Sequence, residues 1–185
     1  MKKNLILLGL SLALVLPVRA TIDYTATPGL AIADNSTVGT GDQLAFNVTQ
    51  SGLLQGLTLN FGLQDGFATD LTGYLRFGNT VSSPFYDLTS LIQAGTLSAG
   101  SPTSYSIGFT TPGFQSAFNG VNPNGTWTLF LADTSAGGVS TLQNWQLQMD
   151  IVAVPELETW IAAALAGVFG AFWLNRQSWA GVKKV

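Results

Sequence analysis

The sequence predicts an all-β fold, an antiparallel β-sandwich or jelly roll, with an apolar segment at each end of the chain. Two observations predict this class. Apolar and polar residues alternate in several runs of strand length, and groups of Asp, Asn, Gly and Pro separate the runs. A helical period extends beyond a turn or two only around residues 87–94. The sequence between the apolar segments shows no internal repeat and no linker, so we expect its strands to form one β domain.

Six alternating runs are the expected strands. They cover residues 44–49, 57–63, 71–77, 104–109, 127–131 and 145–151. Turns are expected at residues 34–36, 41–42, 78–79, 122–125 and 136–138. Short strands at this spacing, each with one polar face, are typical of sheets that pack face to face.

The chain begins with the pattern of a secretory signal peptide, in residues 1–20. Lys2 and Lys3 precede a 12-residue apolar run, and the small residues Val18 and Ala20 follow it. A short basic region, an apolar region and small residues before the cleavage point define such a peptide. We expect cleavage after Ala20, and the alternative is a buried N-terminal helix.

The charge of the following stretch excludes several classes of partner. Residues 21–154 contain eight Asp, no Glu and one basic residue, Arg76, so eight minus one leaves a net charge of −7. Such a surface repels phosphates, which excludes nucleic acid and disfavours an anionic membrane surface. The chain has no Cys, so no disulfide stabilises the expected domain at residues 21–153.

The second apolar segment, residues 159–174, predicts a short transmembrane helix. It carries no charge over 16 residues. As a helix it spans about 24 Å, against roughly 30 Å for a hydrocarbon core. Trp160 and Trp173 flank it like interfacial anchors, and Arg176 begins a basic tail, which the positive-inside rule places in the cytoplasm. The alternative is a core helix of a soluble domain.

Val154, Pro155 and Glu156 stand between the domain and this helix. With the helix and the basic tail they resemble the PEP-CTERM sorting signal of exported Gram-negative bacterial proteins, although Leu157 replaces the second Pro. The resemblance assigns residues 154–185 to this signal and implies processing by an exosortase, a membrane-embedded cysteine protease or transpeptidase. It implies an inner-membrane-anchored precursor and a mature protein in the cell envelope or outside the cell.

A second resemblance covers most of residues 28–151 and is strongest in its last third. The chain is similar to the P domain, the β-sandwich that follows the catalytic domain in subtilisin-like proprotein convertases. The matching positions are Asn124, Gly125, Trp127, Leu129, Asp133, Leu142, Trp145 and Leu147. The resemblance implies a galactose-binding-like sandwich in which these residues are structural.

Elementary physical reasons support structural roles for the main motif residues. Gly125 ends a turn before a strand, and Trp127 and Trp145 are expected to face the core, where each buries about 150–250 Å². Asp133 is expected to accept backbone N–H groups in the turn after its strand. The alternative for Trp145 is a shelf that holds a ligand.

The residue types present exclude the commonest catalytic chemistries. With no His and no Cys, the chain cannot form a Ser-His-Asp site, a Cys-His site or a usual zinc site. Carboxylates leave two possibilities: an acid pair such as Asp65 and Asp70, as in a glycosidase, and a structural calcium with Asp34, Asp65 and Asp70 as candidates. We expect no other cofactor.

These observations favour a non-catalytic exported protein of the envelope or extracellular matrix, which acts in adhesion, matrix structure or polysaccharide interaction. The alternative is an accessory module that stabilises or targets a subtilisin-like serine protease in trans. A third hypothesis, a weak glycoside hydrolase, depends on Asp70. The expected partners are an exosortase-type enzyme, the inner membrane before processing, and an extracellular polysaccharide.

Overall fold

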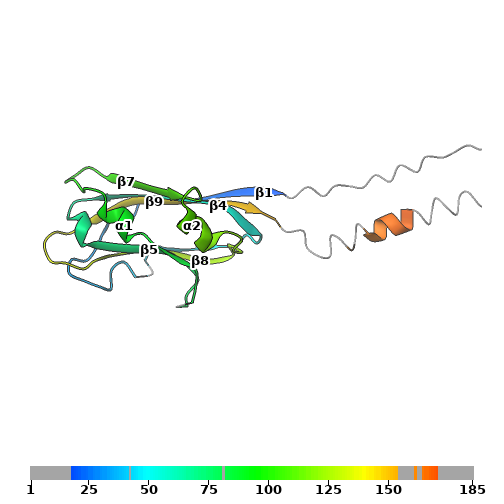
Figure 1. Cartoon of the computed structure of the whole chain (residues 1–185), viewed down its shortest axis with the longest axis horizontal. Coiled ribbons are helices and arrows are strands. Elements are labelled where there is room, and N and C mark those ends of the chain that lie inside the picture. The colour runs from blue at the N-terminus through cyan, green and yellow to red at the C-terminus, as the bar shows by residue number, and fades with distance from the viewer. Residues whose placement is uncertain (1–17, 42, 81, 154–160, 162–163, 171–185) are drawn as a thin grey trace, which may run out of the picture.

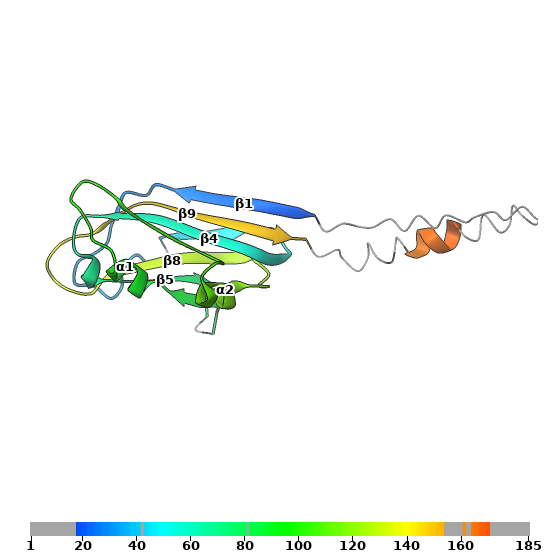
Figure 2. The ribbon, with the colours of Figure 1, turned by 45° about the horizontal axis from the view of Figure 1, so that its top comes forward.

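Two antiparallel sheets pack face to face in the computed structural model, which describes residues 18–41, 43–80, 82–153, 161 and 164–170. The first sheet has the strand order β1-β9-β4-β7, with β2 also paired to β9, and the second has the order β3-β8-β5-β6. Figure 1 shows the two layers one above the other, and Figure 2 shows β1, β9 and β4 side by side. The predicted antiparallel all-β sandwich is confirmed.

The strand bounds follow the alternating runs of the sequence. The first sheet consists of β1 (Arg19–Ala26), β2 (Leu30–Ala31), β4 (Leu53–Gln64), β7 (Thr103–Gly108) and β9 (Thr141–Val152). The second consists of β3 (Ala45–Val48), β5 (Leu71–Phe77), β6 (Phe85–Asp87) and β8 (Gly125–Asp133), and a 3-10 turn, η1 (Ala68–Asp70), precedes β5. All six expected runs are strands, whereas β1, β2 and β6 lie outside them.

Alternation along each strand sends one set of side chains into the core between the sheets. In β4, Leu57, Leu59 and Phe61 are at most 2% exposed. Thr58 and Asn60, between them, belong to the outer face of the sheet and are half-buried. The same pattern holds in β9 and β7, so the first sheet has an apolar inner face and a polar outer face.

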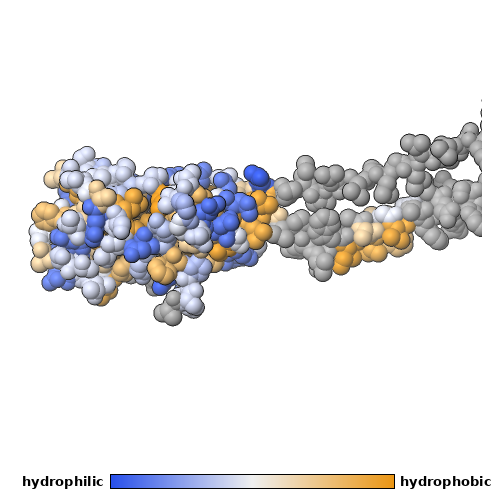
Figure 3. All heavy atoms as spheres, viewed as in Figure 1, coloured by the Kyte–Doolittle hydropathy of each residue, from blue (hydrophilic) through white to orange (hydrophobic). Residues whose placement is uncertain are grey.

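Two short helices close one open side of the sandwich. α1 (Thr89–Gln93) packs on β5, and α2 (Pro112–Phe118) contacts β4, β6 and β7. Phe114 and Phe118 of α2 are fully buried. α1 lies within the expected helical region, but α2 does not, although its initial Pro and its two Phe four residues apart are helix signals. On the side seen in Figure 3, hydrophilic and neutral residues predominate, with scattered apolar ones.

Aromatic side chains close the opposite side, between β1 and β3. The rings of Tyr24 and Phe46 stack with their centroids 4.0 Å apart and their planes 5° from parallel. Trp145 lies against both rings, at centroid distances of 5.1 and 5.6 Å. These contacts join the edge strands of the two sheets and protect the core there.

The first and last strands begin and end side by side. Arg19 pairs with Val152, and Ala20 pairs with Ile151. β1 therefore starts before the domain boundary expected at Thr21. Cleavage after Ala20 would shorten this strand without removing its remaining pairs with β9.

The expected terminal segments lie largely outside the described residues. This holds for residues 1–17 of the signal peptide and for the sorting residues 154–156. Residues 161 and 164–170 are helical. Within the part of the chain that the structure describes, no helix is both long enough and apolar enough to cross a membrane.

Candidate binding surfaces

The Asn-Gly-x-Trp motif lies at the start of β8 and shapes the turn that leads into it. Asn124 Nδ2 donates a hydrogen bond to Ser51 Oγ at 3.1 Å. Gly125 has a φ of +144°, a conformation that favours glycine. Trp127 is fully buried, and its Nε1 donates to the carbonyl of Pro123 at 3.0 Å, so the indole has its polar atom satisfied within the core.

The later motif residues are also in the core. Leu142 is 0% exposed and Trp145 is 1% exposed. A ligand shelf formed by Trp145 is therefore wrong, because the indole has no surface to offer. Trp127, Leu142 and Trp145 thus belong to the buried core of the sandwich and offer no binding surface.

Asp133 is a buried carboxylate at the end of β8. It is 0% exposed, the Ser135 N–H donates to its Oδ1 at 3.4 Å, and its Oδ2 has no hydrogen-bond partner among the described residues. Burial raises the pKa of Asp133; the charges of Asp34 and Asp70 also raise it, while the Ser135 N–H lowers it. Asp34 and Asp70 therefore lie close enough to act on this carboxylate.

The expected calcium candidates divide between two places. Asp34 and Asp70 lie near Asp133, whereas Asp65 Oδ1 accepts the N–H of Gly100 at 3.0 Å in another loop. Among the described residues, no group of three or more Asp, Glu, His or Cys side chains is arranged to hold a metal ion. A structural calcium and an Asp65–Asp70 acid pair stay predictions.

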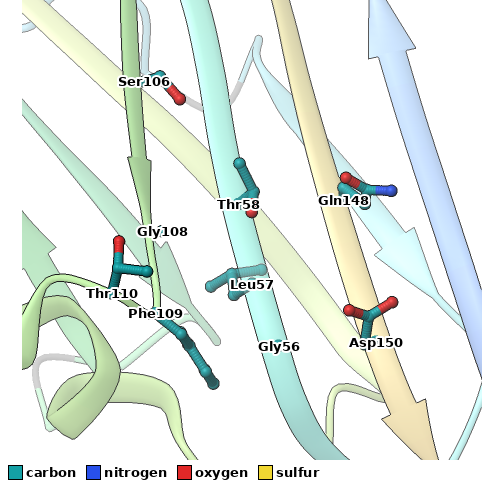
Figure 4. A pocket seen from close by; sticks show the side chains of 9 residues that line it. All are labelled: Gly56, Leu57, Thr58, Ser106, Gly108, Phe109, Thr110, Gln148 and Asp150. Carbon is teal, nitrogen blue, oxygen red and sulfur yellow. The ribbon is translucent and has the colours of Figure 1, made fainter.

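The outer face of the first sheet has an open groove of about 470 Å³ over β4, β7 and β9. Its lining includes Gly56, Thr58, Ser106, Gly108, Gln148 and Asp150. Figure 4 shows Gln148 and Asp150 on β9, to one side of β4, and Ser106 on the strand to the other side. The strand register aligns Gly108, Thr58 and Gln148 in one row across the three strands.

Two glycines, Gly56 and Gly108, add no side chains to the floor of this groove. A Cβ on Gly56 would lie 2.8 Å from Asp150 Oδ2, and a Cβ on Gly108 would lie 3.3 Å from Thr58 Oγ1. Larger side chains at these positions would fill the groove. Phe109 extends the lining beyond the end of β7.

A ladder of side-chain hydrogen bonds borders the groove. Asn60 Nδ2 donates to Gln146 Oε1 at 3.1 Å, and Gln146 Nε2 donates to Asp23 Oδ1 at 2.8 Å. Thr21 Oγ1 donates to Asp150 Oδ1 at 2.8 Å. These bonds order the outer face from β4 to β1 and hold Asp150 at the wall of the groove.

The outer face of the second sheet carries an aromatic face, which consists of Tyr74, Arg76, Phe85 and Phe130. Tyr74 and Phe130 are register partners whose rings stack with centroids 4.6 Å apart and planes 12° from parallel. Arg76 Cζ lies 5.8 Å from the centroid of the Tyr74 ring, within the range of a cation–π contact. Phe85 pairs with Arg76 and is 58% exposed.

Sequence reasoning found the motif residues but missed both surfaces. The signal for the groove was present, since Thr58, Ser106 and Gln148 occupy polar positions of three expected strands. Nothing in the alternation says that these strands are neighbours, because strand order depends on pairing between distant parts of the chain.

The fold and its buried motif residues define a β-sandwich module similar to the P domain. A family model described as the proprotein convertase P-domain matches residues 93–149, which extend from the end of α1 into β9. Among curated proteins, no sequence matches the chain. The resemblance stated from the motif is therefore supported for the C-terminal part of the sandwich.

A solved structure with a TM-score above 0.5 extends the similarity to 75% of this chain at the level of the fold, and a second structure has a lower score. One is a chain of the crystal structure of the Aeromonas sobria serine protease (ASP) in complex with the chaperone (ORF2). It has 15% sequence identity and a TM-score of 0.52, over 75% of this chain and 28% of that chain. The other is the Aeromonas sobria serine protease, with 15% identity, a TM-score of 0.49, and 74% and 28% coverage. The present chain thus matches about a quarter of the length of these larger chains.

Proposed function

We propose that the β-sandwich is a non-catalytic accessory module that binds a subtilisin-like serine protease in trans and stabilises or targets it. The observation that carries this proposal is the match of residues 93–149 to the proprotein convertase P-domain. The fold similarity to part of a serine protease structure agrees with it. The proposal includes the jelly-roll, galactose-binding-like form of sandwich that the P-domain resemblance implies.

The composition of the chain supports a non-catalytic role. Its 185 residues contain no His and no Cys. A Ser-His-Asp triad therefore cannot be completed among them. A module of this kind contributes through binding, by holding its partner in the folded state or by placing it near a substrate.

We place the protease-docking surface on the aromatic face of the second sheet. Protein interfaces are enriched in aromatic residues and Arg, and a few such residues provide most of the binding energy. Tyr74 and Phe130 already stack on each other, and Arg76 lies over Tyr74, so little side-chain freedom is lost on binding. The net charge of −7 over residues 21–154 favours a protease surface with basic residues.

The test is co-expression of the full chain with a subtilisin-like protease from the same organism. Affinity purification with a catalytically inactive protease measures binding, and the half-life of the active protease at elevated temperature measures stabilisation. We expect co-purification and a longer half-life. A ligand that binds only the folded state stabilises it by about 2.7 kcal/mol when present at a hundredfold excess over Kd. Absence of co-purification together with an unchanged half-life would refute the proposal.

A pair of variants tests the docking surface separately. The double substitution Tyr74→Ala and Phe130→Ala is expected to weaken protease binding at least about tenfold, or about 1.4 kcal/mol. Gln148→Ala, on the outer face of the other sheet, is the matched control and should leave binding unchanged. Equal losses in both variants would show that docking does not depend on the aromatic face.

We further propose that the chain is exported and sorted through its C-terminal segment by an exosortase-type enzyme. The support is the order of basic, apolar and small residues in 1–20 and the sequence Val154-Pro155-Glu156 before the apolar segment 159–174. Glu156→Ala is expected to leave the precursor in the inner membrane, as measured by intact mass in membrane, periplasmic and medium fractions. Normal maturation of this variant would overturn the sorting proposal.

A role in adhesion or matrix structure has weaker support than the protease module. It depends on the sorting residues 154–156, which lie outside the described residues. The P-domain match, in contrast, lies within the described sandwich. The module role is therefore the conclusion that the described residues favour.

A further inference from the structure

Three polar side chains of the groove have no hydrogen-bond partner in the described part of the chain. They are Thr58, Ser106 and Gln148, and they come from the three adjacent strands β4, β7 and β9. The neighbouring ladder differs, because its Asn60 and Gln146 bond to each other. Gln148 offers two donors and an acceptor, and each hydroxyl offers a donor and acceptor sites. The groove thus presents a set of unused hydrogen-bonding groups to a ligand.

The floor of the groove does not suit a peptide added as an extra strand. β4 is an interior strand whose Thr58 pairs with Gln148 on one side and with Gly108 on the other. Its backbone groups are used in these two ladders, whereas strand addition needs a free sheet edge. Side chains alone are available there, so the ligand has to bring polar groups of its own.

Electrostatics disfavour an anionic ligand in this groove. Asp150 stands at the wall, and one of its oxygens faces the position above Gly56. The surrounding domain has a net charge of −7 over residues 21–154. An anionic polymer would bring its charges next to this carboxylate and be repelled. A neutral ligand avoids this cost, and its hydroxyl groups can still donate hydrogen bonds to the Asp150 carboxylate.

The dimensions suit a single extended chain of small rings. Adjacent strands lie about 4.7–4.9 Å apart, so β9 and β7 stand roughly 10 Å from each other across β4. Gly56 and Gly108 add no side chains to the floor, where the nearest side chains are those of Asp150 and Thr58. At one end Phe109 is half-buried and packs edge-on against Phe114, with centroids 6.2 Å apart, which leaves part of its ring for an apolar ligand face.

We propose that this groove binds a neutral, hydroxyl-rich glycan chain. Gln148 and Asp150 bind its hydroxyl groups from one wall, Ser106 binds from the other, and Thr58 binds from the floor. The site lies on the outer face of the first sheet, so the aromatic face of the second sheet stays accessible when the glycan is bound. One module can then hold a protein partner and a polysaccharide at the same time.

The test uses the full chain, labelled with ¹⁵N and purified in dodecylphosphocholine, because maltoside detergents carry sugar headgroups. Cellohexaose, laminarihexaose and maltohexaose are titrated as neutral probes, and an oligogalacturonate is the anionic control. We expect saturable amide shifts in β4, β7 and β9 with at least one neutral probe and none with the anionic one. The protein partner is absent from this assay, so its result is independent of the protease-binding test.

Three variants distinguish the groove from other surfaces. Gly108→Val fills the floor, and Gln148→Ala removes exposed donors without changing the core; each is expected to weaken binding at least about tenfold. Ser104→Val, on the same strand and the same face but outside the lining, is the matched control and should bind like the unmodified chain. The proposal is overturned by a lack of shifts with all three neutral probes, by shifts confined to other strands, or by equal affinities in all variants. Tighter binding of the anionic probe would overturn it as well.

Discussion

The two outer faces of the sandwich follow the same strand alternation and yet form different surfaces. On the first sheet the outward residues Gly56 and Thr58 border an open groove. On the second sheet the outward residues Thr128 and Ala132 are only 2% and 1% exposed. The residues that stay at the surface there include the stacked pair Tyr74 and Phe130.

The loop between β2 and β3 accounts for part of this difference. The Thr40 N–H donates to the Leu131 carbonyl at 2.8 Å, and Thr40 Oγ1 accepts the Leu131 N–H at 3.1 Å. This brings Gly39 against Ala132. The loop thus acts as a short extension of the second sheet. Polar alternation predicts a strand, but the packing of this loop against Ala132 reduces the accessible part of the outer face.

The largest effect is expected where this loop meets β8. Gly39 has a φ of +52°, and a Cβ there would overlap the Leu131 carbonyl oxygen and lie 2.8 Å from the Ala132 Cβ. Gly39→Ala is expected to lower the free energy of unfolding by about 3 kcal/mol, from left-handed strain and overpacking. Urea denaturation measures it. Gly41→Ala, with a φ of +53° and open space, is the control and should cost about 1 kcal/mol. Equal decreases in the free energy of unfolding for Gly39→Ala and Gly41→Ala would contradict the close packing of Gly39 against β8.

A smaller effect is expected on the aromatic face. Tyr74→Ala removes the stack with Phe130 and the contact with Arg76, and should lower the free energy of unfolding by about 1 kcal/mol. Gln148→Ala, an exposed residue on the other outer face, should change it by less than about 0.5 kcal/mol. Thermal unfolding followed by circular dichroism compares the two. A larger decrease in the free energy of unfolding for Gln148→Ala than for Tyr74→Ala would contradict this prediction.

Asp133, at the end of β8, gives a pH-dependent prediction. Because the pKa of Asp133 is raised in the folded state, its ionisation destabilises the fold as pH rises from the ordinary value of 3.8 through the raised pKa. Asp133→Asn keeps an acceptor for the Ser135 N–H and removes the buried charge, so it should raise Tm at neutral pH. This increase in Tm should become smaller as pH falls from the raised pKa of Asp133 toward 3.8. A lower Tm for the variant at neutral pH, with a difference that disappears when a chelator lowers the Tm of the unmodified chain, would instead indicate a cation at Asp133.

The smallest effect is expected in the groove itself. Gly108→Ala adds a methyl group 3.3 Å from Thr58 Oγ1 in a strand where Gly carries an entropic penalty. The free energy of unfolding should change by less than about 0.5 kcal/mol, because the close contact with Thr58 destabilises the variant while the loss of the entropic penalty of Gly stabilises it. Chemical denaturation tests this directly. A loss comparable to that of Gly39→Ala would show that the groove glycines are structural.

The sequence predicted most strands but not all, and the differences have physical causes. The run 71–77 coincides with β5, and the run 145–151 lies within β9. From the sequence, no strand is predicted at β1, although Ile22 and Tyr24 alternate with polar residues there. Its strand identity depends on pairing with β9, more than a hundred residues away.

Asp133 likewise combines a property that the local sequence indicates with one that depends on distant segments. Asp133 was identified from its motif, but its closeness to Asp34 and Asp70 follows from the pairing of Leu71 with Asp133 and from the loop around Ser36. Because Asp34, Asp70 and Asp133 are far apart in the sequence, no local pattern indicates that they are close in space.

By itself, the sequence determined the all-β class, the acidic charge of the domain and the absence of His-based and Cys-based chemistry. These properties depend on composition and on the two-residue period of a strand, which are local. Only the tertiary structure decided the strand order, the burial of Trp145 and Asp133, and the juxtaposition of Thr58, Ser106 and Gln148 in one groove. Neighbours in a sheet are set by pairing and packing between distant segments, and that information is not contained in any single run of the chain.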